Sequence, residues 1–355
     1  MNISQNLVYR KSTGEMIGFV NLEKNQVFAD IAAMEKYLST GTTKVQPEIA
    51  TKMLSFMVKG VASSIKDVVA SYSVNKLTSQ FLYAETWEVI NRCERSDIRI
   101  ISFVSDGFAV NRSFLKKHTP ARETKGGLIY ATVNKSAPHR LLFFMSDVAH
   151  LIKTIRNSLS NSRLGKKSKR CLQKCGEKML WQTIVDLYNA KRDRVLRKSY
   201  KLTAQHIYID SYSAMKVRFA AQVLSKTVAQ ELEDMKWPGT KQLIEFIRRV
   251  NDWFDCLNGA FSTQGLRTRN HNLDPYTKED DPRFEELEEF LQYLSDWKEE
   301  VYSLQALGNA SQSFGGDDQD LSFDVIMQEE RADNEANEVT EDTPAAKKTS
   351  GQLHP

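Results

Sequence analysis

Two apolar runs that each end in an aspartate constrain most strongly what this chain can fold into. "IRIISFVSD" (98–106) is rich in β-branched and aromatic residues, ends in Asp106 and is followed by a helical pattern. "HRLLFFMSD" (139–147) repeats this arrangement and enters the helical pattern "VAHLIKTIRNSL". Short apolar runs that lead into helices are typical of buried strands in an α/β fold. Carboxylates at such strand ends are also where metal-dependent phosphoryl-transfer enzymes hold their metal ions.

The residues before Asp106 complete the pattern of a mixed sheet. "LVYRKSTGEMIGFVNL" predicts two strands with a turn at Thr13–Gly14, and "KMLSFMVKGVA" and "VVASYSV" predict further strands. "LTSQFLYAETWEVINRCER" has apolar residues at helical spacing. Hairpin strands, a helix and a strand ending in Asp106 match the order of an RNase H-like sheet. We therefore expect an α/β domain over residues 1–146.

The chain beyond this domain is dominated by helical periodicity. Apolar residues recur at helical spacing from about Leu151 onward, with a break at Trp237-Pro238-Gly239 and a helix start at Asp281-Pro282. Cys171 and Cys175 fall in this region and are expected on a helix. From about Leu307 the composition turns to Gly, Ser, Asn, Asp and Glu, which cannot bury enough surface to fold. We expect a mostly helical domain over 147–306 and a disordered acidic tail over 307–355.

Charge divides the chain into a basic body and an acidic tail. Residues 316–342 hold eleven acidic residues and Arg331, a local charge of −10, so the remainder of this +4 protein carries +14. A basic body suggests a nucleic-acid partner, although a solvated surface explains it equally well. The same two interpretations apply to a basic cluster that could contact DNA phosphates, which consists of Lys153, Arg156, Arg163, Lys166, Lys167, Lys169 and Arg170. No apolar run approaches the roughly 18 residues of a membrane span, so we expect a soluble intracellular protein without a membrane partner.

Two sites carry candidate chemistry, each with a structural alternative. Asp106 could bind Mg²⁺ together with other carboxylates, or it could cap the helix that follows the strand. In "WFDCLN", Phe254, Asp255 and Asn258 lie within one helical turn. A carboxylate can accept both donors of a guanine edge, and an aromatic ring can stack on the base. By spacing alone, however, Phe254 fits a core position and Asp255 a surface position.

Four segments together resemble one family, the P-element-type transposases and their THAP-domain relatives. They are "SDGFAVNRSFLKKH", "FFMSDVAHLIKTIRNSL", "KLTAQHIYIDSYSAMKVRFAAQVLSKTVAQEL" and "FIRRVNDWFDCLN". The resemblance runs in order from about Leu7 to about Leu304. It implies an RNase H-like catalytic domain that is interrupted by a helical GTP-binding insertion domain. It also implies DNA as partner, GTP and Mg²⁺ as cofactors, and a nuclear location.

The resemblance assigns roles to particular residues. Asp106 resembles the second catalytic, metal-binding aspartate of the family. Asp147 and His150 keep two characters of the "DPPHLLK"-like entry to the insertion, in which Val148 and Ala149 replace the prolines. The residues that resemble guanine-nucleotide contacts are Lys201, Val217, Phe254, Asp255 and Asn258.

Departures from the family pattern shape the expected function. The strand that carries the first catalytic aspartate would precede Leu7, where this chain reads "MNISQN", and "QDLSF" (319–323) has Phe323 where the family has its final glutamate. We expect a transposase fragment, truncated at both ends, that lacks DNA cleavage and strand transfer but retains guanine-nucleotide binding. The alternatives are a DNA- or partner-binding regulator derived from a transposase and, least favoured, an active Mg²⁺-dependent enzyme. An incomplete sheet would also favour a homo-oligomer.

Overall fold

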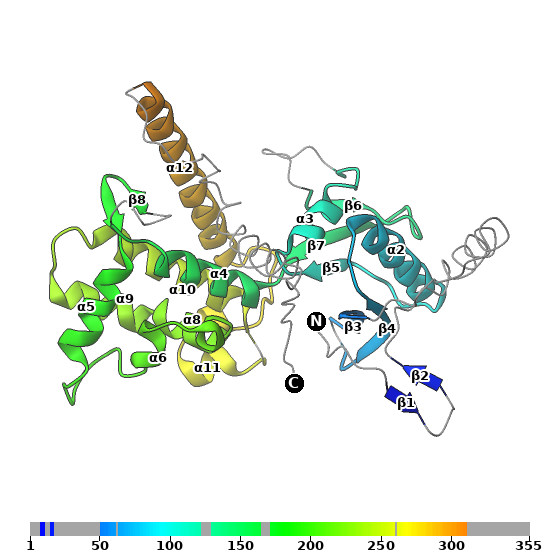
Figure 1. Cartoon of the computed structure of the whole chain (residues 1–355), viewed down its shortest axis with the longest axis horizontal. Helices are drawn as coiled ribbons and strands as arrows, with labels where there is room; N and C mark the ends of the chain where they lie inside the picture. The colour runs from blue at the N-terminus through cyan, green and yellow to red at the C-terminus, as the bar shows by residue number, and fades with distance from the viewer. Residues whose placement is uncertain are drawn as a thin grey trace, which may run out of the picture. The chain divides into compact units, whose positions relative to one another are not determined.

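The structure is a computed structural model that describes residues 8–10, 15–17, 50–61, 63–121, 129–164, 171–259 and 261–310. For residues 8–10, 15–17 and 305–310 only the backbone elements are described. The chain forms two compact units (Figure 1). Unit 1 comprises Met1–Phe103 and Val110–Met145, and unit 2 comprises Val104–Ala109 and Ser146–Pro355. A small mixed α/β region followed by helices confirms the predicted fold class.

Unit 1 begins with two antiparallel hairpins. β1 (Val8–Arg10) pairs with β2 (Glu15–Ile17), and β3 (Lys52–Lys59) pairs with β4 (Lys66–Val74) with an irregularity between Phe56 and Met57. Both hairpins lie where the alternating apolar runs predicted strands. Thr78 then caps the helix α2 (Ser79–Arg95) by accepting a hydrogen bond from the backbone N–H of Phe81 at 3.2 Å.

A three-stranded mixed sheet of order β5-β7-β6 follows α2. Its strands are β5 (Ser102–Ser105), β6 (Ala131–Val133) and β7 (Leu141–Ser146). β6 and β7 are antiparallel. The N–H groups of Phe143 and Asp147 donate to the carbonyls of Ile101 and Ser105, so partners advance equally along both strands. β5 and β7 are therefore parallel, as a mixed sheet requires.

Aromatic residues form the core of unit 1. The buried cluster comprises Leu82, Trp87, Ile90, Phe114, Leu142 and Phe144, contributed by α2, β7 and α3 (Ala109–Leu115). His118 is buried beside these rings. Its Nε2 accepts a hydrogen bond from Trp87 Nε1 at 3.1 Å, so the proton of the neutral ring lies on Nδ1 and faces the carbonyl of Phe114 at 3.0 Å. Burial lowers the pKa of His118 and keeps this tautomer neutral.

Unit 2 is a helical domain around one apolar core. Its longer helices are α4 (Val148–Ser160), α5 (Trp181–Lys191), α9 (Lys226–Met235), α10 (Lys241–Leu257) and α12 (Arg283–Ala310). Its shorter elements are α6 (Ala204–Ile207), α7 (Ser211–Ala214), α8 (Val217–Val223), α11 (Gln264–Thr268) and the 3₁₀ helix η1 (His271–Leu273). The core gathers apolar residues from α4, α5, α8, α9, α10 and α12. None of the helices in the described residues is long and apolar enough to cross a membrane.

One sequence expectation for unit 2 is wrong. Residues 172–179 form a β-hairpin of β8 (Leu172–Lys174) and β9 (Glu177–Met179) instead of a helix. Cys175 and Gly176 both adopt positive φ at its turn, and Cys171 lies just before β8, so these cysteines are not on a helix. The helix α12 ends at Ala310, and residues 311–355 of the tail predicted over 307–355 lie outside the described residues.

Candidate functional site

The candidate site is built around the last turn of α10. Buried apolar residues recur along this helix at Leu243, Phe246, Ile247, Val250 and Phe254, and they fix the face that packs into the core. Asp255 follows Phe254 and is therefore turned about 100° away from it, to the margin of the core, where it is half-buried. A carboxylate at such a position is costly unless donors surround it.

Two asparagine side chains supply donors to Asp255. Asn251, one turn earlier on α10, donates from Nδ2 to Asp255 Oδ2 at 3.0 Å, and Asn270 donates from Nδ2 to the same oxygen at 2.8 Å. Burial raises the pKa of Asp255, while the hydrogen bonds from Asn270 and Asn251 lower it and Lys226 adds a smaller lowering effect. The arrangement is that of a half-buried carboxylate that is fixed in orientation through one of its oxygens.

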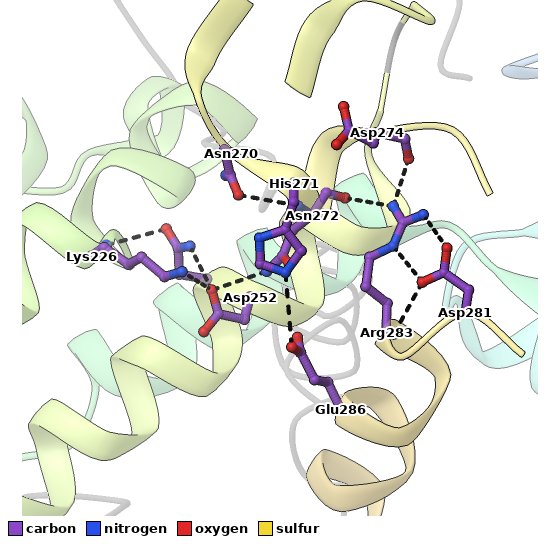
Figure 2. A network of polar contacts seen from close by, with 10 residues as sticks. Lys226, Asp252, Asn270, His271, Asn272, Asp274, Asp281, Arg283 and Glu286 are labelled. Atoms are coloured by element: carbon purple, nitrogen blue, oxygen red, sulfur yellow. Dashed lines mark hydrogen bonds and ion pairs between the residues drawn. The ribbon is translucent and has the colours of Figure 1, made fainter. Parts of the chain in front are cut away.

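A polar network joins α9, α10 and the segment before α12 (Figure 2), and Asp255 is linked to it through Asn251 and Asn270. The ammonium of Lys226 lies 2.6 Å from Asp252 Oδ1, and Asn272 Nδ2 donates to the same oxygen at 3.2 Å. Asn270 Oδ1 accepts the backbone N–H of Asn272 at 3.2 Å. The first turn of α9, the last turns of α10 and η1 are thus connected through side chains.

Arg283 holds the segment that delivers Asn270 and Asn272. Its guanidinium binds both oxygens of Asp281, at 2.8 and 2.6 Å. It also donates to the backbone carbonyls of Asn272 and Asp274 at 3.3 and 2.5 Å (Figure 2) and to that of Pro275 at 3.2 Å. The hydrogen bond to Arg283 lowers the pKa of the Asp281 carboxyl to about 2. A planar guanidinium is suited to this task because it presents five donors in a fixed geometry.

The other residues predicted to bind a nucleotide are dispersed. Phe254 is 6% exposed within the core, and Asn258 is exposed at the end of α10. Val217 begins α8 and packs half-buried against the same core as Phe254. Lys201 is exposed before α6, with its ammonium 5.6 Å from the centre of the Tyr200 ring. Within the described residues, no hydrogen bond or ion pair joins Lys201 to Asp255, so their joint role stays a prediction.

Asp106 lies in a turn between β5 and α3. Its Oδ1 accepts the backbone N–H of Phe108 at 3.1 Å, directly before α3 begins at Ala109. This contact favours the structural alternative, in which Asp106 stabilises the turn that leads into the helix. Asp147 ends the neighbouring parallel strand, where its Oδ1 caps α4 through the N–H of Ala149 at 2.9 Å. Its Oδ2 lies 3.7 Å from His150 Nε2. Both aspartates therefore take part in local turn or capping interactions.

The donor set does not fit a catalytic Mg²⁺ ion. Among the residues that the structure describes, no three His, Cys, Asp or Glu side chains come together in a group that could hold a metal. Mg²⁺ requires near-octahedral oxygen coordination, and in phosphoryl transfer it must contact both the attacking and the leaving oxygen. The described surroundings of Asp106 do not supply the further carboxylates that such an ion needs.

The predicted basic cluster is only partly described, and one of its members is misplaced. Arg156 is fully buried, so the prediction that it lies on a DNA-facing surface is wrong. Its Nη2 donates to the carbonyls of Ser213 and Ala214 at 3.0 and 2.8 Å, and burial lowers the pKa of its guanidinium to about 10. Lys153 is half-buried with its ammonium 3.5 Å from His150 Nε2, and Arg163 is exposed. Lys166, Lys167, Lys169 and Arg170 lie outside the described residues.

Sequence reasoning missed the residues that surround Asp255. Asn270 and Asn272 lie in "RNHNLDP", which reads only as a polar connection between helices. Asn251 reads as one more polar residue on the outer face of α10. The available signal was the density of Asn and Asp near a helix end, because such residues favour turns and local hydrogen bonds. That signal does not reveal which carboxylate they contact.

Comparisons with known proteins agree with the two-part architecture. Residues 1–119 match the family described as "TNP-like, RNase H N-terminal domain", and residues 149–266 match "TNP-like, GTP-binding insertion domain". The transposable element P transposase of Drosophila melanogaster is 29% identical over 130 residues, which are 35% of this chain and 16% of that protein.

A solved structure, described as "Drosophila P element transposase strand transfer complex", matches with a TM-score of 0.63 and 18% identity. The match covers 96% of this chain and 64% of the other, so this chain spans less than two thirds of either relative. At that identity the structural match shows the fold alone. The two domain families in this order, the sequence match and the shared fold lead to one conclusion: this chain is a relative of the P-element-type transposases.

Proposed function

We propose that the helical unit binds a guanine nucleotide and that Asp255 recognises the base. The observation that carries the proposal is the fixed, half-buried carboxylate of Asp255 in the region that matches a GTP-binding insertion domain. An ionised carboxylate only accepts hydrogen bonds. Guanine presents donors at N1 and at its exocyclic amino group, whereas adenine presents an acceptor at N1. Asp255 would therefore bind guanine and repel the corresponding edge of adenine.

The remaining predicted residues have supporting roles in this proposal. Lys201 supplies a positive charge for the phosphates, Val217 and Phe254 supply the apolar side of the base, and Asn258 lies one turn after Phe254. Phe254 is buried in the structure, so contact with the base is limited to the edge of its ring unless neighbouring side chains move. Asp255 is accordingly the residue to test first.

The test is the change in melting temperature of the full chain with GTP, ATP or no nucleotide. A ligand that binds only the folded state raises its stability once its concentration exceeds the dissociation constant. We expect GTP at millimolar concentration to raise the melting temperature, ATP to do so much less, and Asp255→Ala to remove the GTP effect. Asp186→Ala is a matched control, because Asp186 is an exposed aspartate on α5. Equal shifts with GTP in the wild type and in Asp255→Ala would refute the role of Asp255.

A second proposed property is DNA binding by the basic body of the chain, which would make the protein a transposase-derived regulator in the nucleus. The support is the charge of +14 outside residues 316–342 and the relationship to a protein solved in a strand transfer complex. Binding through phosphates predicts an affinity that falls steeply with salt. DNA affinity that is independent of salt would contradict an electrostatic surface.

We further propose that the described carboxylates do not support DNA cleavage. Asp106 has no pair of acidic neighbours among the described residues that could complete a metal site. The measurement is nicking of supercoiled DNA in the presence of Mg²⁺ or Mn²⁺. Metal-dependent nicking that disappears in Asp106→Ala would show an active enzyme and overturn this part of the proposal.

A further inference from the structure

The hydrogen bonds around Asp255 have a consequence for which purines it can distinguish. Both asparagine amides donate to Oδ2, and within the described part of the chain no residue donates to Oδ1. A carboxylate oxygen has two in-plane lone pairs, so two amide donors saturate Oδ2. Recognition of guanine through two hydrogen bonds needs both oxygens of the carboxylate. The observed arrangement leaves only one oxygen for the base.

The two amides are themselves held in place. Asn251 Oδ1 accepts the backbone N–H of Lys226 at 3.2 Å, and Asn270 Oδ1 accepts the backbone N–H of Asn272 at 3.2 Å. Because each oxygen is engaged with a backbone donor, each side-chain nitrogen is directed towards Asp255. A base that approaches Asp255 would have to break one of these interactions to reach Oδ2.

Asn270 is also fixed from outside the region that matches the insertion-domain family. That match ends at residue 266, whereas Asn270 belongs to the segment that Arg283 holds through the carbonyls of Asn272 and Asp274 (Figure 2) and that of Pro275. The start of α12 thus determines which atoms of Asp255 are available. This couples a segment beyond the matched domain to base recognition.

We propose that Asn270 is a specificity-determining residue, which occupies Oδ2 of Asp255 and restricts the carboxylate to a single hydrogen bond with a purine donor. The proposal rests on the proposed nucleotide site. The single bond is made to N1–H, which guanine and hypoxanthine share and adenine lacks. The 2-amino group, which guanine has and hypoxanthine and adenine lack, then finds no oxygen on Asp255. The site accepts 6-oxopurine nucleotides as a class and hardly distinguishes GTP from ITP.

The experiment compares the affinities of the full chain for GTP, ITP and ATP by isothermal titration calorimetry at neutral pH, where N1 of guanine and of hypoxanthine keeps its proton. We expect GTP and ITP to bind within about threefold of each other, and ATP at least tenfold more weakly, about the worth of one hydrogen bond to a charged group. In Asn270→Ala, Oδ2 is released for the amino group of guanine. The preference for GTP over ITP should then rise to about tenfold.

Two further variants separate this role from a structural one. Asn251→Ala releases the same oxygen from a different element and should raise the GTP preference in the same way. Asn272→Ala is the matched control, since Asn272 donates to Asp252 and leaves Asp255 unchanged. It should lower the melting temperature without altering the ratio of the two affinities.

The outcomes distinguish the proposed role of Asn270 from the proposed nucleotide binding on which it rests. A wild-type chain that already prefers GTP over ITP by tenfold or more, with no change in Asn270→Ala, would overturn the inference and leave the proposed function standing. Loss of all nucleotide binding in a folded Asn270→Ala would also overturn it, because Asn270 would then be needed for binding itself. A wild-type chain that binds none of the three nucleotides would overturn both.

Discussion

Arg156 allows a direct test of whether a basic residue in this chain serves the fold or a DNA surface. Replacing Arg156 by Met keeps an unbranched side chain only as far as the position of Nε and leaves the carbonyl of Ala214 without its donor, whereas the carbonyl of Ser213 still accepts the backbone N–H of Lys216 at 3.1 Å. One carbonyl without a donor costs about 1–3 kcal/mol. The change also removes a buried charge: burial lowers the pKa of the guanidinium to about 10, a penalty on the charged form of about 3 kcal/mol. The cost and the relief nearly cancel, so the net expectation is a free energy of unfolding that is unchanged or higher by up to about 2 kcal/mol.

Arg156→Lys sharpens this prediction because it should be the more harmful change. Lysine keeps the charge, so the relief of about 3 kcal/mol is not gained, and its shorter side chain does not bring a donor to the position where Nη2 of Arg156 meets both carbonyls. We therefore expect Arg156→Lys to lower the free energy of unfolding, in contrast to Arg156→Met. The usual expectation for a surface residue is the opposite, since Lys would be the conservative replacement.

Urea denaturation followed by tryptophan fluorescence measures both variants, because Trp181, Trp237, Trp253 and Trp297 all lie in unit 2. Arg163→Met is the matched control, since Arg163 is exposed and its loss should change stability by no more than about 0.5 kcal/mol. The reasoning fails if Arg156→Lys leaves the denaturation midpoint unchanged while Arg156→Met lowers the affinity for DNA. That result would place Arg156 on a nucleic-acid surface.

Three further predictions concern titratable and clamping groups. Burial lowers the pKa of His118, so below about pH 6.5 the unfolded chain binds a proton at this residue that the folded chain does not bind. The free energy of unfolding should therefore decrease as the pH falls below about 6.5, by up to about 1.4 kcal/mol per pH unit. Denaturation series at several pH values measure this decrease. His118→Gln should flatten that dependence. Burial raises the pKa of Asp255, so ionisation of this carboxyl opposes folding at pH values above its unfolded pKa of 3.8. Asp255→Asn should therefore leave the denaturation midpoint at neutral pH unchanged or raised. The same variant should lose GTP binding. Arg283→Lys should lower the melting temperature, because a lysine cannot bind three carbonyls and a carboxylate together. It should also raise the preference for GTP over ITP, because the segment that carries Asn270 is then held less firmly. An unchanged preference in calorimetry would show that Arg283 has no role in base recognition.

The elements that sequence patterns predicted are those whose local signals agree with their tertiary environment. The strand before Asp106 and the helix over 79–95 have unambiguous periodicity, and both lie where the structure has them. The helix prediction for residues 172–179 failed because "LQKCGEKM" has apolar residues at its ends only, a pattern that suits a helix or a hairpin equally. Its turn depends on positive φ at Cys175, and a cysteine gives no signal for that conformation.

The candidate site was accessible to sequence reasoning only in part. Asp255 could be found through the "WFDCLN" motif, because all of its residues lie on one helix. Its partner Asn270 lies 15 residues later in an irregular segment whose path depends on Arg283, and no periodic pattern encodes such a contact. Arg156 was misplaced for a related reason: spacing places it on the same helix as Lys153, but only the three-dimensional packing reveals the two carbonyls that hold it inside.

The cost of keeping Asp255 ionised argues that this carboxylate has a function beyond the fold. Burial raises the pKa of Asp255, so the ionised form is less stable here than it would be in water. An asparagine could accept a hydrogen bond from a neighbouring amide without carrying that penalty. The chain instead keeps a carboxylate and engages Asn251, Asn270 and, at longer range, Lys226 to stabilise its charge. A side chain that lowers the stability of the fold is expected where a ligand binds to it. The remaining oxygen of Asp255 would bind a purine N1–H donor.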